Sequence, residues 1–185
     1  MPQHDRYPLD EYGYEIYEGN TYPLAYLITI RTYGTWLHGD ARNAIDRHCL
    51  NVFGTRKMPP DKKLEIARRE ESKFPPVIFS DQHREIIDKA IRDFCKRKGY
   101  PVEALNVRTN HAHVVISAER RPERLADAIK AAATRKLRKA RLFPDEVQIW
   151  SRGRSRRYLW KPRQVEAAVG YVLYGQGDEP FDCSE

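Results

Sequence analysis

The chain has 185 residues, a formal net charge of +7 and three widely spaced cysteines, Cys49, Cys95 and Cys183. This length suits one domain with a real hydrophobic core, and the cysteines indicate neither a disulfide framework nor a paired-cysteine metal site. No signal pattern is found and no apolar run approaches the ~20 residues of a membrane span, so we expect a soluble, cytoplasmic protein without a membrane partner.

The charge is unevenly distributed. Residues 1–22 hold five acidic residues and one Arg, together with many tyrosines, and show no sustained hydrophobic period. We interpret them as an acidic, Tyr-rich arm that is poorly ordered. Residues 120–163 hold 15 Lys and Arg against four Asp and Glu. A segment this basic favours a polyanionic partner, nucleic acid before an anionic membrane, although a solvated basic face is the alternative.

We expect residues 23–178 to form a single domain, with a tail at 179–185. Its first strand is predicted at Leu24–Gly34, LAYLITIRTYG, which is rich in β-branched and aromatic residues. The long connection at about 35–79 is typical of an insertion and contains a short charged helix near residues 61–72.

From Ser80 onward the hydrophobic pattern is sharper. Ser80 is a suitable N-cap, Ile86, Ile87, Ala90, Ile91 and Phe94 lie on one helical stripe, and Gly99 is a suitable stop. The elements predicted after it are strands at 100–109 and 111–117, a helix at 122–141, a short strand at 146–150, a basic loop at 151–157 and a last helix at 161–174. The order β-α-β-β-α-β-α predicts an α+β fold: a ferredoxin-like, split βαβ antiparallel sheet with helices on one face and an added C-terminal helix.

Two histidines one residue apart open an apolar strand in the stretch TNHAHVVIS, residues 109–117. Because side chains alternate along a strand, His111 and His113 project from one face and Ala112 from the other. Two imidazoles whose Cα atoms are about 7 Å apart can bind one divalent ion. Such an ion needs at least one more ligand. The alternative to a metal site is that the two histidines only make hydrogen bonds to neighbouring residues. The residues open for that third position are His38, His48, His83, Asn106 and Gln176.

The histidine strand is followed by a basic helix, an Arg-rich segment and a helix that carries Tyr171 in VGYVLYGQG. This order resembles the HUH single-tyrosine transposases, which include the insertion sequence 200/605 group and the REP-associated tyrosine transposases. NHAHVVI is similar to the family's N-H-x-H-hydrophobic strand, and VEAAVGYVLYGQ is similar to its tyrosine helix. The resemblance covers about residues 24–177, and the segment 35–79 within it matches no pattern of the family.

The resemblance implies a DNA transposase that cleaves and rejoins single-stranded, hairpin-bearing DNA. Tyr171 would attack phosphorus to give a 5′-phosphotyrosine link and a free 3′-hydroxyl. His111 and His113 would hold Mg²⁺ or Mn²⁺, which polarises the phosphate. The family often places a ligating Gln or Asn four residues after the tyrosine, where this chain has Gly175, so Gln176 is our third ligand.

Tyr174 remains the rival nucleophile. Tyr171 lies off the buried stripe formed by Val165, Val169 and Val172, and Tyr174 lies further off still. The match to the family motif favours Tyr171. An ordinary surface tyrosine is the alternative for both.

Aromatic and basic residues alternate in the segment WSRGRSRRYLWKPR, residues 150–163, as expected of a platform that stacks bases and binds phosphates. Packing of the tryptophans in the core is the alternative. The predicted DNA-binding residues here and on the preceding helix are Lys130, Arg135, Lys136, Arg138, Lys139, Arg152, Arg154, Arg156, Arg157, Trp160 and Arg163.

Three other functions remain open at the level of sequence. One is a non-catalytic, hairpin-binding ferredoxin-like module, such as a domesticated transposase remnant. Another is a relaxase or replication initiator, whose tyrosine and histidines tend to occur in a different order. The third is a metal nuclease without a covalent step. The family resemblance further implies a prokaryotic, nucleoid-associated protein, and a homodimer as one option.

Overall fold

The computed structural model describes residues 22–35, 37 and 61–175. The predicted arm apart from Tyr22, most of the predicted insertion and the C-terminal tail lie outside these residues. The elements in chain order are β1 (Ala25–Thr32), α1 (Lys62–Glu70), α2 (Asp81–Lys98), β2 (Val102–Val107), β3 (His111–Ile116), α3 (Pro122–Lys139), β4 (Trp150–Leu159) and α4 (Pro162–Tyr174).

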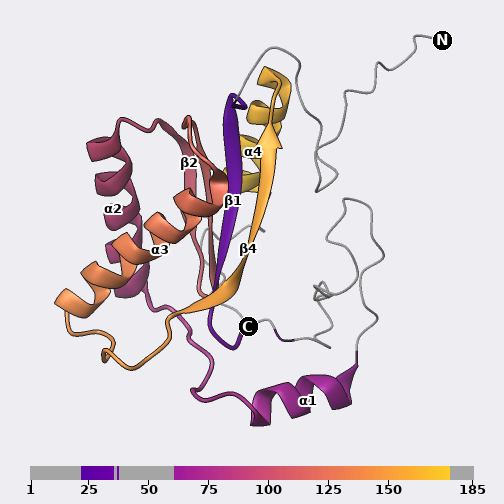
Figure 1. Ribbon diagram of the computed structural model, residues 1–185, viewed down its shortest axis with the longest axis vertical. Coiled ribbons are helices and arrows are strands. Elements are labelled where there is room, and N and C mark those ends of the chain that lie inside the picture. The colour runs from indigo at the N-terminus through magenta and orange to yellow at the C-terminus, as the bar shows by residue number, and fades with distance from the viewer. Residues whose placement is uncertain (1–21, 36, 38–60, 176–185) are drawn as a thin grey trace.

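The four strands form one antiparallel sheet in the order β2-β3-β1-β4. Two β-α-β units interleaved in this order are the split βαβ arrangement, which confirms the predicted ferredoxin-like α+β fold. Figure 1 shows α2 and α3 together on one side of the sheet and α4 on the other. No helix in the described ranges is long and apolar enough to cross a membrane.

The alternation of side chains divides the sheet into two faces. Ile28, Val114 and Ile116 belong to the main core, with the apolar stripes of α2 and α3. Val115 and Leu159 belong to a smaller cluster with α4. His111 and His113 have the same parity as Val115, so they lie on the α4 side, away from the main core.

Local signals set the ends of α2 as predicted. The Ser80 hydroxyl accepts a hydrogen bond from the His83 backbone N–H at 3.5 Å, and the Ser80 N–H donates to His83 Nδ1 at 3.0 Å. Gly99 ends the helix with φ of 67°, a left-handed conformation that suits glycine. Such reciprocal capping explains why this boundary could be predicted from sequence.

His83 makes the stability of this helix start depend on pH. Its ring packs against Phe79 and Phe143, and burial lowers its pKa from the usual 6.5. The unfolded chain therefore binds more protons than the folded chain just below pH 6.5, and stability is lost as the pH falls through that window. We expect the urea midpoint to drop more between pH 7.5 and 5.5 in the wild type than in His83→Gln. Equal drops would contradict this assignment.

The prediction of a strand at 146–150 and a basic loop at 151–157 was wrong. β4 begins at Trp150 and runs through the basic segment to Leu159, paired with β1 at the edge of the sheet. Its Ser, Gly and Arg composition is typical of a loop. Charged side chains are also common on edge strands, where they discourage pairing with a further strand. The composition therefore fits a loop or an edge strand, and the pairing with β1 makes this segment an edge strand.

Candidate active site

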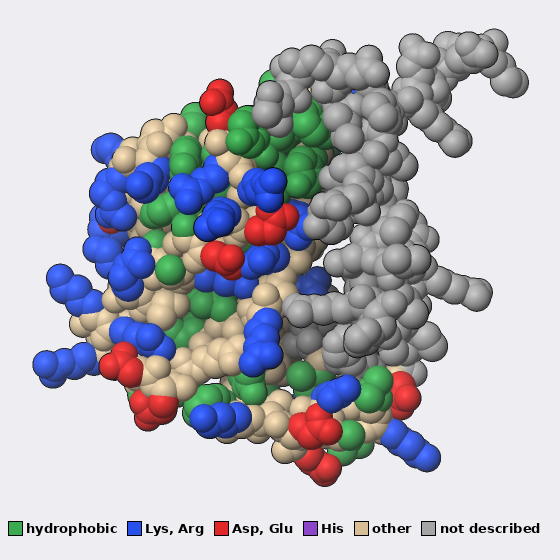
Figure 2. All heavy atoms as spheres, in the orientation of Figure 1, with side chains coloured by type: hydrophobic (Ala, Val, Ile, Leu, Met, Phe, Trp, Pro, Cys, Tyr) green, Lys and Arg blue, Asp and Glu red, His purple; other side chains and the backbone are tan. Residues whose placement is uncertain are grey.

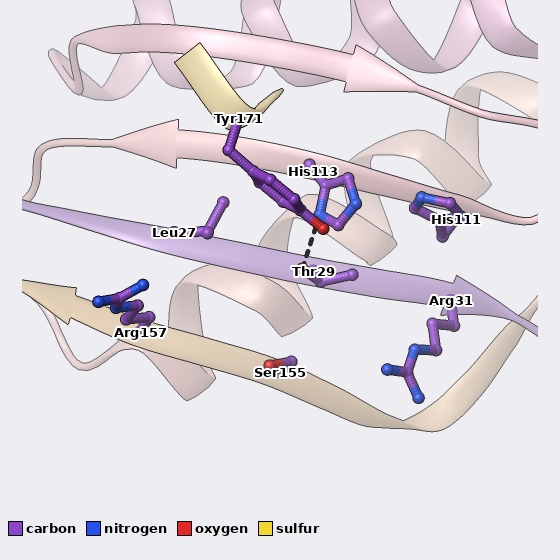
Figure 3. A pocket seen from close by; sticks show the side chains of 8 residues that line it. All are labelled: Leu27, Thr29, Arg31, His111, His113, Ser155, Arg157 and Tyr171. Atoms are coloured by element: carbon purple, nitrogen blue, oxygen red, sulfur yellow. Dashed lines mark hydrogen bonds between the residues drawn. The ribbon is translucent and has the colours of Figure 1, made fainter. Parts of the chain in front are cut away.

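A pocket of about 300 Å³ opens on the α4 side of the sheet. It is built mainly from alternate positions of β1, β3 and β4, with one side chain from α4 (Figure 3). The lining residues are Leu27, Thr29, Arg31, His111, His113, Ser155, Arg157 and Tyr171.

The two histidines share this pocket, as the strand period predicted. Their ring centroids lie 4.6 Å apart, and the residues are only 8% and 6% exposed. His111 Nδ1 lies 2.5 Å from Asn110 Oδ1, and His113 Nδ1 lies 2.7 Å from Thr29 Oγ1. Each ring is therefore oriented through Nδ1 by a neighbouring oxygen atom.

This arrangement fits a metal ion bound through the Nε2 atoms. Metal-ligating histidines usually make a hydrogen bond through their other ring nitrogen, which fixes the tautomer and the ring orientation, and Asn110 and Thr29 are placed to do this. No group of three or more His, Cys, Asp or Glu residues that could hold a metal is found in the described part of the chain. Any further ligand of such a metal would be another residue type or would lie outside the described residues, as His38 and His48 do. Gln176, the predicted third ligand, lies outside the described residues.

Tyr171 reaches the pocket from α4. Its ring points toward His113, with the two ring centroids 5.6 Å apart (Figure 3). The residue is 46% exposed, whereas the rival Tyr174 is 81% exposed and does not line the pocket. Because Ala168 and Val172 are buried against the sheet, the helix period carries Tyr171 to the pocket rim and Tyr174 away from it.

The predicted basic residues of β4 divide between the two faces of the sheet. Arg157 lines the pocket. Arg154 and Arg156 have the opposite parity and face α3, where they form ion pairs with Asp127 and Glu123. The Arg156 pair is 2.8 Å long and mostly shielded from water. A DNA phosphate would have to compete with those carboxylates, so Arg157 is the better placed of the three.

Trp160, the predicted stacking residue, is buried and stacks on Tyr158 at 6.1 Å between centroids. Its backbone N–H donates to Gln164 Oε1 at the start of α4. These contacts favour the alternative of a tryptophan packed in the core. Arg152 on β4 and Arg163 on α4 are exposed, as contact with DNA requires.

The basic residues of α3 lie on the opposite side of the sheet from the pocket. Figure 2 shows Lys and Arg side chains gathered over the face formed by α2 and α3. Lys130 is buried, and its ammonium donates to the Ser151 and Gly153 carbonyls at 2.9 Å each. Arg138 bonds to the carbonyl of Asp145. The predicted DNA-binding residues of α3 that are exposed are Arg135, Lys136 and Lys139.

Sequence reasoning missed the contribution of β1 to the pocket. Thr29 pairs with His113 and Arg31 pairs with His111 across the β1–β3 ladder. Both line the pocket, together with Ser155 of β4. The polar residues at alternate positions of TIR were a weak signal. The pairing that makes it meaningful joins segments more than 80 residues apart.

A family model for IS200-like transposases matches residues 73–170, more than half of the chain. The match includes both histidines and ends one residue before Tyr171. No curated protein matches significantly.

Among solved structures, a candidate transposase from Deinococcus radiodurans R1 is similar, with 14% identity, a TM-score of 0.46 and coverage of 88% of this chain and 97% of its own. A REP-associated tyrosine transposase bound to a REP hairpin is also similar, with 11% identity, a TM-score of 0.45 and coverage of 87% and 71%.

Proposed function

The chain belongs to the IS200-like transposase family, and from this premise we propose that it cleaves and rejoins single-stranded, hairpin-bearing DNA through a covalent link between Tyr171 and a 5′-phosphate. One observation carries the proposal most directly: the ring of Tyr171 lies against His113 in the pocket that also holds His111 and Arg157. A metal-assisted transesterification needs a nucleophile, side chains that can bind the metal ion and a cation that binds the phosphate.

In the first step the Tyr171 hydroxyl loses its proton and its oxygen attacks phosphorus. The new bond joins this oxygen to the 5′-phosphate, and the bond from phosphorus to the 3′-oxygen breaks. The 3′-oxygen takes up a proton and leaves as a hydroxyl. Rejoining reverses these steps with a second 3′-hydroxyl as nucleophile. One ester replaces another in both directions, so no nucleotide cofactor is consumed.

The remaining pocket residues prepare this exchange. His111 and His113 would hold Mg²⁺ or Mn²⁺, which supplies Lewis-acid polarisation of the phosphate when bound. Asn110 and Thr29 orient the two rings through Nδ1. Arg157 presents its guanidinium to a phosphate oxygen at the pocket wall.

The positions of the exposed basic residues support a DNA partner larger than the cleaved strand. Arg152 lies on β4 and Arg163 on α4, two elements that line the pocket, whereas Arg135, Lys136 and Lys139 lie across the sheet on α3. We propose that single-stranded DNA enters the pocket and that an adjoining hairpin contacts the outer basic residues.

The test is a covalent-adduct assay. Purified protein is mixed with single-stranded hairpin oligonucleotides labelled at either end, with Mn²⁺, Mg²⁺ or a chelator, and run on a denaturing gel. We expect metal-dependent retention of the 3′ label on the protein and release of the 5′-labelled fragment, because the tyrosine keeps the 5′-phosphate side. His111→Ala and His113→Ala should each lower the adduct by about 10²-fold or more.

His83→Ala is the matched control, because His83 lies in the first turn of α2 and does not line the pocket. It should leave the adduct unchanged. Tight DNA binding without an adduct in either metal would overturn the proposal and favour the non-catalytic hairpin-binding module.

A further inference from the structure

α4 has only a small apolar interface with the sheet. Ala168 and Val172 are its buried residues, with Val165 and Val169 partly buried beside them. Such contacts are non-directional and do not by themselves determine the position of a helix along its axis. Tyr171 must nevertheless stay within reach of His113, which requires directional contacts near the tyrosine.

Asn106 supplies one such contact. It lies on β2 directly across from His113 in the β2–β3 ladder. Its side-chain Nδ2 donates to the carbonyl of Val172, the residue after Tyr171, at 2.9 Å. The β2–β3 pair thus carries His113 on one strand and, on the other, the residue that holds the backbone next to Tyr171.

The position of this hydrogen bond in the helix gives it a specific role. α4 ends at Tyr174, so Val172 belongs to the last turn, whose carbonyls have no donor inside the helix. The amide of Asn106 satisfies one of them. The same hydrogen bond therefore helps to end the helix and fixes the position of its last turn relative to the sheet.

Gly175 holds Tyr171 from the other side. Its N–H donates to the Tyr171 carbonyl at 3.0 Å. A Cβ atom at Gly175 would lie 2.9 Å from the backbone carbonyl oxygen of Tyr171 and 3.1 Å from the ring carbon Cδ2 of the same residue. Any other residue there would force the backbone or the ring to move. Gly170 lies inside α4, and apart from its chain neighbours and the backbone of the helix itself no heavy atom lies within 4 Å of such a Cβ.

We propose that Asn106 and Gly175 are positioning residues that hold Tyr171 against His113 for the attack on phosphorus. This rests on the proposed function. Asn106 anchors the last turn of α4 to the histidine strand pair, and Gly175 leaves the space in which the tyrosine ring lies. Misplacement of a reacting group by about 1 Å can cost about 10²-fold in rate, so small shifts at this helix end matter.

The first test compares Asn106→Asp and Asn106→Ala with the wild type. Asp keeps the size of the side chain but cannot donate to Val172, so it separates loss of the bond from loss of packing. We expect single-turnover adduct formation to slow by about 10–100-fold in both variants, while the DNA dissociation constant changes less than about twofold. Glu103→Ala, an exposed change on the same strand, should alter neither quantity.

A spectroscopic measurement reports the position of the ring without any reaction. The nuclear Overhauser cross-peak between ring protons of Tyr171 and His113 should be present in the metal-free wild type, because the rings are in edge contact. It should weaken or vanish in both Asn106 variants while the rest of the spectrum remains that of the folded protein.

The second test compares Gly175, which directly follows α4, with Gly170 inside the helix. Gly175→Ala should weaken the same cross-peak and slow adduct formation by about 10-fold or more. Gly170→Ala should leave both unchanged and raise the urea midpoint of unfolding, as expected where alanine replaces glycine in a helix interior.

The outcomes separate this proposal from the proposed function. An unchanged cross-peak or an unchanged rate in both Asn106→Asp and Asn106→Ala would overturn the role of Asn106, and the same result in Gly175→Ala would overturn that of Gly175. A wild-type protein without an adduct would overturn the proposed function. The cross-peak would then still decide whether these two residues hold Tyr171 in place.

Discussion

Tyr171→Phe is expected to abolish the covalent protein–DNA adduct, while Tyr174→Phe retains it. Phenylalanine preserves the ring that contacts His113 but lacks the oxygen that forms the bond to phosphorus. Removal of a covalent nucleophile is among the largest single-residue effects in enzymes, so we expect a loss of more than about 10³-fold. Tyr174 does not line the pocket and is 81% exposed, which places its hydroxyl away from the histidines.

The assay uses a 3′-labelled oligonucleotide and a denaturing gel for each variant. DNA affinity serves as the internal control. Tyr171→Phe removes only the phenolic hydroxyl group, so this variant should bind DNA like the wild type. Loss of the adduct in Tyr174→Phe with retention in Tyr171→Phe would exchange the two roles. It would also require α4 to rotate relative to the sheet when DNA is bound.

Lys130→Met is expected to destabilise the fold by about 2–3 kcal/mol. The residue is 9% exposed, and its ammonium donates to two backbone carbonyls, those of Ser151 and Gly153, at 2.9 Å. Methionine has a similar length but no donor, so both carbonyls lose a charge-assisted hydrogen bond. These carbonyls lie at the start of β4, near the irregularity in its pairing with β1, so this part of the edge strand should loosen first.

Lys136→Met is the matched control, because Lys136 is an exposed lysine on the same helix. Urea denaturation should show a change within about 0.5 kcal/mol for this variant. DNA binding should show the reverse order of effects. Loss of one phosphate contact in Lys136→Met lowers the slope of log affinity against log salt by about 1. A stable Lys130→Met protein with a reduced salt slope would instead support the DNA contact predicted for Lys130.

Much of the fold could be predicted from local pattern. A strand repeats every two residues and an α-helix every 3.6, so apolar positions reveal the elements and their buried faces. Ser80 and Gly99 mark the ends of α2 through backbone hydrogen bonds and a left-handed conformation that involve only neighbouring residues. The same logic puts His111 and His113 on one face of a strand, because their separation of two residues is a property of the chain itself.

The tertiary structure alone decided which side chains surround those histidines. Thr29 and Arg31 enter the pocket because β1 pairs with β3, and Asn106 meets Val172 because β2 lies on the other side of β3. Pairing depends on distant segments, and one strand's period contains no information about its partner.

The roles of the basic residues were decided in the same way. Arg157 faces the pocket while Arg156 pairs with Glu123, and Lys130 is buried although Lys136 is exposed. By sequence these residues look alike, as dense positive charge that indicates a polyanionic partner. Which of them can reach DNA depends on the face each one occupies and on the carboxylates and carbonyls opposite it, because a cation that is buried and bonded within the protein has to break those bonds before it can bind a phosphate.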